Sequence, residues 1–268
     1  MKALLEKMMK NTIELTRTNV ETAVGSSKIG GKPDLPRSFE WFRYNIDGES
    51  VPLSFVAQIN LSEAAEYDKD GVLPKKGMLY FFYEFSSMTW GYDPKDAGSA
   101  RVYLYEGDEE LVRTEFPKDL SEEYFVPESA VKLSAKKCIP SYEELTDEIS
   151  REGFAEYDDA AVELGFDPER DTEEIFKLLG YADIIQGDMR YECEAVSRGF
   201  YLGNAPKIDE ETNREILAAQ NEWVLLAQFG TLSDELMFGD CGSIYYYIRK
   251  DDLAEKRFDK AWLVLQCG

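Results

Sequence analysis

The chain of 268 residues contains no histidine, and that absence excludes several kinds of site. Histidine is the commonest general base near neutral pH and the commonest transition-metal ligand in proteins. Neither a Ser-His-Asp nor a Cys-His catalytic site can be built from this chain alone, and neither can a zinc site with histidine ligands. We therefore expect no metal site and no cofactor, and we favour a protein that is not an enzyme.

Cysteine is scarce as well. The four cysteines, Cys138, Cys193, Cys241 and Cys267, lie far apart, so the chain has no paired Cys-x-x-Cys zinc signature. We interpret them as buried free thiols in a reducing cytoplasm. One disulfide pair is the alternative.

Long apolar runs are absent, so no segment is predicted to span a membrane. Residues 1–10 are charged throughout and lack the apolar core of a signal peptide. These features predict a cytoplasmic protein. Apolar residues at helical spacing predict an amphipathic helix over residues 2–17, which we expect to dock on the core of the protein rather than on a membrane surface.

Basic residues are outnumbered, with 30 of them against 53 acidic residues and a formal charge of −23. A surface of this sign repels phosphate backbones, which argues against nucleic acid as a partner. It attracts basic proteins, so a basic protein partner is one hypothesis. The hydrophobic content of 44% is that of a folded globular chain.

One sequence module occurs twice. Residues 53–61 form an apolar strand pattern that carries Ala57-Gln58, and residues 77–83 form an aromatic strand pattern that begins with glycine. Residues 222–230 and 242–248 repeat this order around Ala227-Gln228. The pattern predicts a single domain over residues 1–268, with internal pseudo-repeats around 51–86 and 222–267.

The predicted strands cluster towards the two ends of the chain, and the predicted helices lie in the middle. Strands are expected at 51–61, 77–85, 100–106, 110–116, 130–138, 222–229, 243–249 and 261–267. Helices are expected at 141–165, 171–179 and 209–221. The expected fold class is α+β, with mostly antiparallel strands in two pseudo-repeated halves and an acidic helical middle.

Several short motifs, taken in order, are shared with a known family. They are Gly30-Gly31-Lys-Pro33-Asp-Leu-Pro36 followed by Trp41, Phe55-Val-Ala-Gln58, Gly180-Tyr-Ala-Asp183-Ile-Ile-Gln186-Gly-Asp188 and Phe238-Gly239-Asp240-Cys-Gly242. In these motifs the chain resembles the YwqG-like family of bacterial proteins, although that family often has Trp where this chain has Phe238 and Pro where it has Ala182. The resemblance implies an α+β fold, a bacterial cytoplasmic setting and a domain of unknown function.

The candidate ligand-binding residues are amides and carboxylates, namely Gln58, Gln186, Asp188, Gln228 and Asp240. Such glutamines either brace loose backbone groups or line a pocket for a small polar ligand. The aspartates lie beside glycines, where they form turns and caps, bind a hard cation, or work as an acid–base pair. The remaining motif residues are expected to be structural: Gly30, Gly31, Pro33, Pro36, Trp41, Gly239 and Gly242.

The leading hypothesis is a non-enzymatic module that binds a protein or a ligand. The acidic residues between 143 and 163 would then steer a basic partner, and a family association with toxin systems makes an immunity or antitoxin-like role a further hypothesis. The alternative is a small-molecule-binding protein or an enzyme, with a carboxylate- and amide-lined site between the two halves. A structural scaffold is the third. The aromatic runs 80–83 and 245–247 belong either to a two-sided core or to an exposed partner-binding patch.

Overall fold

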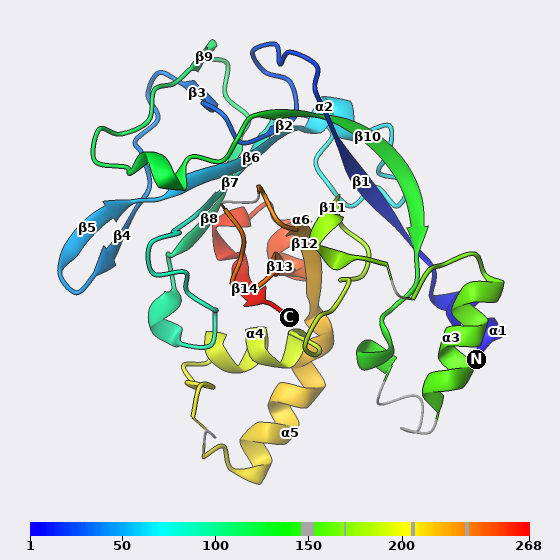
Figure 1. The fold of residues 1–268 in the computed structure, drawn as a ribbon. Helices are drawn as coiled ribbons and strands as arrows, with labels where there is room; N and C mark the ends of the chain where they lie inside the picture. The colour runs from blue at the N-terminus through cyan, green and yellow to red at the C-terminus, as the bar shows by residue number, and fades with distance from the viewer. Residues whose placement is uncertain (146–152, 169, 205–206, 234–235) are drawn as a thin grey trace.

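The computed structural model describes residues 1–145, 153–168, 170–204, 207–233 and 236–268, and its largest element is one antiparallel sheet (Figure 1). Its strands are β1 (Lys10–Thr18), β2 (Lys28–Ile29), β6 (Ser54–Asn60), β7 (Met78–Tyr83), β8 (Ala100–Tyr105), β10 (Ser129–Cys138), β11 (Phe176–Leu178), β12 (Trp223–Phe229), β13 (Ser243–Arg249) and β14 (Trp262–Gln266). This ten-stranded sheet has the order β14-β13-β12-β11-β1-β10-β2-β6-β7-β8. With helices outside the sheet, the fold class is α+β.

The sequence of longer and shorter strands is the same when the sheet is followed inwards from either edge. Strands β1 and β10 pair with each other in the centre. Each carries a short strand on its other side, β11 on β1 and β2 on β10. An antiparallel unit of three strands then follows on each flank, and both units contain a register shift, between Phe55 and Ala57 and between Leu225 and Ala227.

The sheet curves so that its two flanks face each other across the main core. The ring of Phe81 lies 5.1 Å from those of Phe229 and Tyr246, and the Tyr246 hydroxyl donates to the carbonyl oxygen of Phe82 at 3.1 Å. Because side chains alternate along a strand, the neighbours of these rings point to the outer faces of the flanks. Those faces are covered too, and residues 80–83 and 245–247 are all buried. Of the two alternatives for these runs, the structure shows the two-sided core and not an exposed patch.

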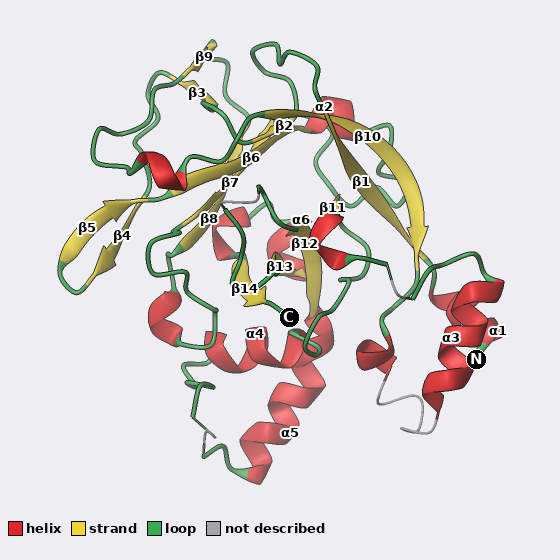
Figure 2. Cartoon of the chain, in the orientation of Figure 1, coloured by secondary structure: helices red, strands yellow, loops and turns green. Residues whose placement is uncertain are grey.

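Smaller elements cover the sheet. Two further two-stranded sheets pair β3 (Asp34–Pro36) with β9 (Leu111–Arg113), far apart in the chain, and β4 (Arg43–Ile46) with β5 (Glu49–Pro52) in a hairpin. The helices are α1 (Lys2–Met8), α2 (Leu61–Ala64), α3 (Phe154–Glu163), α4 (Arg190–Ser197), α5 (Glu210–Ala219) and α6 (Lys250–Ala254). Figure 2 shows α1 with α3 at the end of β1 and β10, and α4 with α5 at the bottom of the view.

Two helix predictions are wrong. The helix predicted over residues 2–17 ends at Met8 and is followed by β1, which pairs on both sides. The helix predicted over 171–179 is a 3-10 turn, Thr172–Glu174, followed by β11. Long-range pairing overrides the local pattern in both places, and β-branched residues in β1 favour the strand. Of the helix predicted over 141–165, residues 142–145 form a 3-10 turn and 154–163 form α3, while 146–152 lie outside the described residues.

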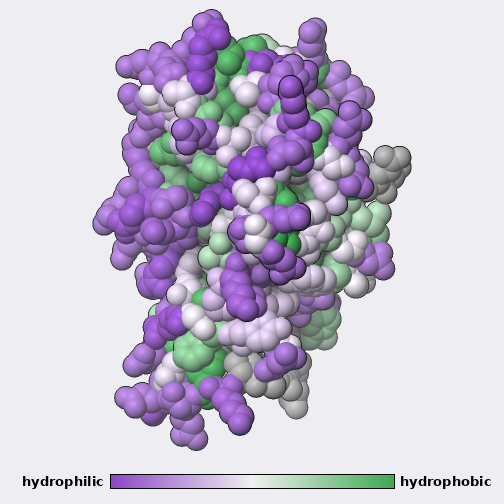
Figure 3. All heavy atoms as spheres, turned by 90° about the vertical axis from the view of Figure 1, so that its left-hand side faces the viewer, coloured by the Kyte–Doolittle hydropathy of each residue, from purple (hydrophilic) through white to green (hydrophobic). Residues whose placement is uncertain are grey.

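The surface agrees with the acidic composition. The face seen in Figure 3 is mostly hydrophilic, with small scattered apolar areas. Within the described ranges, no helix is long and apolar enough to cross a membrane.

All four cysteines are free thiols. Cys193 is buried as expected, whereas Cys241 is exposed, which corrects the prediction that the thiols are buried.

Candidate functional site

A buried cluster of polar side chains lies on the outer face of the N-terminal flank. Lys28, Gln58 and Tyr80 are register partners on β2, β6 and β7, so their side chains share one face. The amide oxygen of Gln58 accepts the main-chain N–H of Asp34 at 2.8 Å, and the Tyr80 hydroxyl donates to the carbonyl oxygen of Asp34 at 2.5 Å. These bonds hold the segment that follows β2 against the sheet.

The same arrangement occurs on the C-terminal flank. Lys177, Gln228 and Tyr245 are register partners on β11, β12 and β13. The amide oxygen of Gln228 accepts the main-chain N–H of Asp183 at 3.0 Å, and the Tyr245 hydroxyl donates to the carbonyl oxygen of Asp183 at 2.6 Å. Each flank therefore presents a lysine and an aspartate on a glutamine–tyrosine frame.

The N-terminal cluster is closed by charged groups of the chain itself. The Asp34 carboxylate is fully buried and accepts the Nε–H of Arg113 at 2.8 Å. The Lys28 ammonium, also buried, donates to Glu128 Oε2 at 2.9 Å and to the carbonyl oxygen of Lys32 at 2.5 Å. Arg113 and Glu128 pair with each other at 3.6 Å. Two cations and two anions thus balance within the cluster.

Electrostatics in this cluster favour the charged forms. Burial alone would raise the pKa of Asp34, but hydrogen bonds from Arg113, from the main chain of Gly25 and from the Gln58 amide hold it below its usual value. Burial opposes ionisation of Glu128 as well, and its bonds to Thr22 and Lys28 lower its pKa. Each charge therefore has a fixed partner, which is the condition under which buried ion pairs are tolerated.

The C-terminal cluster lacks these closing groups. Lys177 donates to the Asp183 carboxylate, and within the described ranges its ammonium has no other hydrogen-bond acceptor. The Nε2 group of Gln228 is buried and has no partner in the same ranges. Its counterpart Gln58 donates from Nε2 to Asp34 Oδ2 at 2.8 Å. The second cluster therefore has unused hydrogen-bonding capacity.

The registers identify what replaces Glu128. Ala130 faces Lys28 and Glu14 faces Lys177, so Glu128 and Thr12 stand at corresponding places, two residues before them. The short Thr12 side chain donates to the carbonyl oxygens of residues 178 and 179 at 3.1 Å. It does not bind the Lys177 ammonium as a carboxylate at this place would. No strand of the described residues pairs with 183–185 in the way that β9 pairs with β3 and supplies Arg113.

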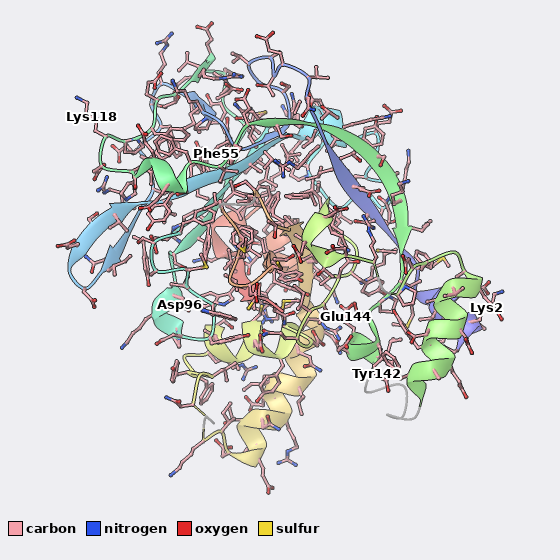
Figure 4. The ribbon with its side chains drawn as sticks, in the orientation of Figure 1. Lys2, Phe55, Asp96, Lys118, Tyr142 and Glu144 are labelled. Carbon is pink, nitrogen blue, oxygen red and sulfur yellow. The ribbon has the colours of Figure 1, made fainter. Side chains whose placement is uncertain are left out.

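A pocket of about 480 Å³ opens at this place. It lies between the strands β1, β10 and β11 on one side and α3 with the Tyr142–Leu145 turn on the other. Figure 4 shows Tyr142 and Glu144 in the region between the sheet and α3. The side chain of Asp183 is 30% exposed here, and that of Lys177 is 6% exposed. The residues that matter for its chemistry are Thr12, Cys138, Tyr142, Tyr157, Lys177 and Asp183.

A second group of charges lies beside the pocket. Arg190 binds the carboxylate of Asp188 through Nε at 2.9 Å and Nη2 at 2.6 Å, and it donates to the carbonyl oxygen of Glu144 at 3.2 Å. Burial raises the pKa of Glu144 to about 7, with the Asp188 charge adding to the effect and the Arg190 charge opposing it. Burial and Asp188 also raise the pKa of Glu192 to about 7.

The structure does not bring the five predicted ligand-binding residues together. Gln58 belongs to the closed cluster and Gln228 to the open one, on outer faces of opposite flanks. Gln186 and Asp240 are exposed, and Asp188 is held by Arg190. The expected site between the two halves is therefore corrected: aromatic side chains fill the space between the flanks, and the alternation of the pleat turns both glutamines away from it.

The predicted structural residues form turns and close contacts. Gly30 and Gly31 have φ of 59° and 66°, and a Cβ on Gly30 would lie 2.4 Å from a carbonyl oxygen. The indole of Trp41 donates to the carbonyl oxygen of Leu53 at 2.8 Å. The carbonyl oxygen of Pro33 accepts a main-chain hydrogen bond, and Pro36 ends β3. Gly239 lies in a left-handed turn, and an added Cβ on Gly242 would meet two carbonyl oxygens.

Sequence reasoning missed Lys177 and Thr12 as site residues, although a signal for the lysine was present. The spacing Lys-x-x-Gly-x-x-Asp occurs at Lys28–Asp34 and again at Lys177–Asp183. Thr12 had no such signal, because its position is defined only by the pairing of β1 with β11. Among the described residues, no group of three or more acidic or cysteine side chains is placed to hold a metal ion.

Comparison with known families covers most of the chain. Residues 27–267 match the family described as a domain of unknown function, DUF1963. The chain belongs to this family. The DUF1963 match includes both clusters but not β1, and therefore not Thr12. It supports the expectation of an uncharacterised domain, while the likeness to YwqG-like proteins stays a resemblance. No curated protein matches the chain.

Proposed function

We propose that this DUF1963 protein is a ligand-binding module whose site is the pocket at Lys177 and Asp183. The observation that carries the proposal is the contrast between the two clusters. Arg113 and Glu128 close the first one, and the second opens into about 480 Å³ of space. Because the registers correspond, we also propose that the two flanks are repeats of one unit within a single domain.

The energetics of the open cluster favour a bound polar group. The buried ammonium of Lys177 has one acceptor and the buried Nε2 group of Gln228 has none within the described residues, so both leave hydrogen bonds unmade. An unsatisfied buried polar group costs about 1–3 kcal/mol. A ligand that accepts from Lys177 recovers part of this cost only when it is bound. The volume lies within the usual range of small-molecule sites, about 300–1,000 Å³.

The pocket has the groups for binding but not an activated nucleophile. Cys138 lines it, yet burial raises the pKa of this thiol, and its sulfur accepts the main-chain N–H of Tyr181 at 3.4 Å. A thiol needs its thiolate form to attack, and the chain has no histidine to remove the proton. These features support binding rather than covalent catalysis, in the bacterial cytoplasm that we propose as the setting.

The test is retention of a small molecule by the purified protein. The protein is mixed with a deproteinised extract of cytoplasmic small molecules and examined by native mass spectrometry. We expect a bound mass that is retained by the wild type, lost in Lys177→Met and kept in Lys136→Met, which removes an exposed lysine at the rim of the same pocket. A wild-type protein that retains nothing, or variants that retain the same mass equally, would contradict the proposal.

A basic protein partner is a second candidate, favoured by one surface. The helix α3 exposes Phe154, which also lines the pocket, at 52% and Val162 at 61%, and Glu156 and Asp159 on the same helix are exposed too. Apolar anchors within an acidic surface suit a basic protein, including one held by an immunity or antitoxin-like protein. Binding that is unchanged between low salt and about 0.5 M salt would argue against electrostatic recognition.

A further inference from the structure

The closed cluster shows which charges the open one is missing. In the closed cluster, Asp34 is bound by a guanidinium and Lys28 by a carboxylate. In the open cluster, Lys177 and Asp183 form an ion pair only with each other within the described residues, and Thr12 stands where the acid would be. Glu14, which faces Lys177, is paired with Arg170 at 2.9 Å and with Lys136 at 3.9 Å instead. Relative to the closed cluster, the described part of the open one therefore lacks one cation for the aspartate and one carboxylate for the lysine.

The two missing charges are neighbours in space. Arg113 Nη1 and Glu128 Oε2 are 3.6 Å apart in the closed cluster. In a free α-amino acid the ammonium and the carboxylate are attached to the same carbon, which places their nitrogen and oxygen atoms about 3 Å apart. Resting on the proposed function, we propose that the pocket binds a zwitterion of this kind, a free α-amino acid, with its ammonium on Asp183 and its carboxylate on Lys177.

Charge balance selects a zwitterion over a simple cation or anion. A cation alone would place two positive charges on one carboxylate, because Lys177 is already there. An anion alone would compete with Asp183 for the Lys177 ammonium. A ligand with both charges restores the two-cation, two-anion balance of the closed cluster, and it leaves no buried charge unpaired.

The pocket also fits the size and character of such a ligand. The Lys177–Asp183 pair lies at one side, and the rings of Tyr142, Phe154 and Tyr157 contact one another on the other, with centroids 5.1 and 5.8 Å apart. This aromatic wall suits the side chain of an apolar or aromatic amino acid. Gln228, whose Oε1 accepts the main-chain N–H of Asp183, has an Nε2 group without a partner in the described ranges, and the corresponding Nε2 of Gln58 binds the Asp34 carboxylate. An Asp183 carboxylate released from Lys177 by the ligand would meet a hydrogen-bond donor there.

The experiment titrates the wild-type protein by calorimetry with L-phenylalanine, L-leucine and L-methionine. The amino acid that binds best is compared with its decarboxylated amine and its deaminated acid, which for phenylalanine are phenethylamine and 3-phenylpropionate. We expect each analogue to bind at least about tenfold more weakly, because each has lost one hydrogen-bonded ion pair. No binding by any of the three amino acids, or equal binding of the analogues, overturns the inference without requiring a variant to fold.

Variants sharpen the assignment of each charge. Asp183→Asn should weaken the binding of the amino acid more than that of the deaminated acid. Asp159→Asn, at an exposed carboxylate of α3 that does not line the pocket, should leave the affinity for the amino acid within about twofold. Thr12→Glu introduces a carboxylate at the position that corresponds to Glu128. The preferred ligand should therefore change from the amino acid to its decarboxylated amine. Thr12→Val is the control for the lost hydroxyl. Unchanged preference in a folded Thr12→Glu protein contradicts the assignment.

The two proposals fail separately. If the extract yields a Lys177-dependent ligand that is not a zwitterion, the ligand class is wrong and the binding function stands. If neither the extract nor any amino acid yields a ligand, both are wrong.

Discussion

The amide oxygen of Gln228 accepts the main-chain N–H of Asp183 at 3.0 Å, as that of Gln58 accepts the N–H of Asp34 at 2.8 Å. The two glutamines differ at the other end of the amide. Gln58 donates from Nε2 to Ser26 and to Asp34, whereas Nε2 of Gln228 has no partner in the described ranges. One glutamine braces a completed cluster, and the other braces a cluster that a ligand can complete.

This difference predicts unequal costs of the same substitution. Gln58→Leu leaves three buried or half-buried bonds unmade, to Asp34 N, Asp34 Oδ2 and Ser26 O, at about 1–3 kcal/mol for each fully buried group. Gln228→Leu leaves only Asp183 N unpaired, because the Nε2 group that it removes has no partner in the described ranges. We expect Gln58→Leu to lower the free energy of unfolding by about 2 kcal/mol more than Gln228→Leu does. Urea denaturation of the two variants measures it, and equal losses would contradict the asymmetry.

The turn after β2 predicts a strong effect at Gly30. Its φ is 59°, and an added Cβ would lie 2.4 and 2.5 Å from the carbonyl oxygens of Pro127 and Val126. Gly165, with φ of 85°, has no atom within 4 Å of an added Cβ and is the matched control. We expect Gly165→Ala to cost about 1 kcal/mol for the left-handed backbone and Gly30→Ala at least about 1–3 kcal/mol more for the overlap. Thermal unfolding of the two proteins compares them, and similar losses would show that the main chain yields.

Stability should fall as pH rises through 7 because of buried carboxyl groups. Burial raises the pKa of Glu144 and of Glu192 to about 7 in the folded protein, above the value of 4.5 for an unperturbed glutamate. The folded state thus holds protons that the unfolded chain has released, so this contribution is complete below about pH 4.5 and is lost as pH rises through 7. Asp34 and Glu128, whose pKa values are lowered, act in the opposite sense at acid pH.

The test compares Glu144→Gln with the wild type at pH 5.5 and pH 8. Because glutamine stays neutral, the variant should raise the melting temperature at pH 8 relative to the wild type and change it less at pH 5.5. Glu143→Gln, at the adjacent glutamate, provides a comparison at each pH. The same shift at both pH values in Glu144→Gln would contradict a raised pKa.

Thiol reactivity should separate the cysteines. Cys241 is exposed, whereas Cys193 is buried and burial raises its pKa well above the usual value. We expect a water-soluble disulfide reagent to modify Cys241 first and Cys193 only after unfolding. Cys138, which lines the pocket, should react at an intermediate rate that falls when a ligand is bound. Peptide mapping of the modified protein checks the order, and early modification of Cys193 would contradict the buried position.

The strands of the two flanks could be predicted because their signals are local. The runs 78–83 and 243–249 are rich in aromatic residues, with two isoleucines in the second run, and such residues fit a sheet covered on both sides. β1 and β11 could not, because each is stabilised by partners far away in the chain: Lys10 pairs with Cys138, and Phe176 pairs with Phe229. Their local patterns fit a helix equally well.

The site was hidden for a related reason. Gln228 was a candidate from its repeat with Gln58, but the importance of Lys177 depends on the absence of an acid at Thr12, and only the pairing of β1 reveals that absence. The raised pKa of Glu144 depends on burial by segments that lie far from it in the sequence. The spacing Lys-x-x-Gly-x-x-Asp was the one local sign that two clusters correspond.

The most direct measurement is an amide chemical-shift titration of the ¹⁵N-labelled protein with the amino acid that binds best or, without a binder, with L-phenylalanine. The account predicts shifts at Thr12, Lys177 and Asp183, while the corresponding Lys28 and Asp34 in the closed cluster stay unchanged and serve as the internal control. Shifts of equal size in both clusters, or none at Lys177 and Asp183, would contradict the assignment of the pocket as the binding site.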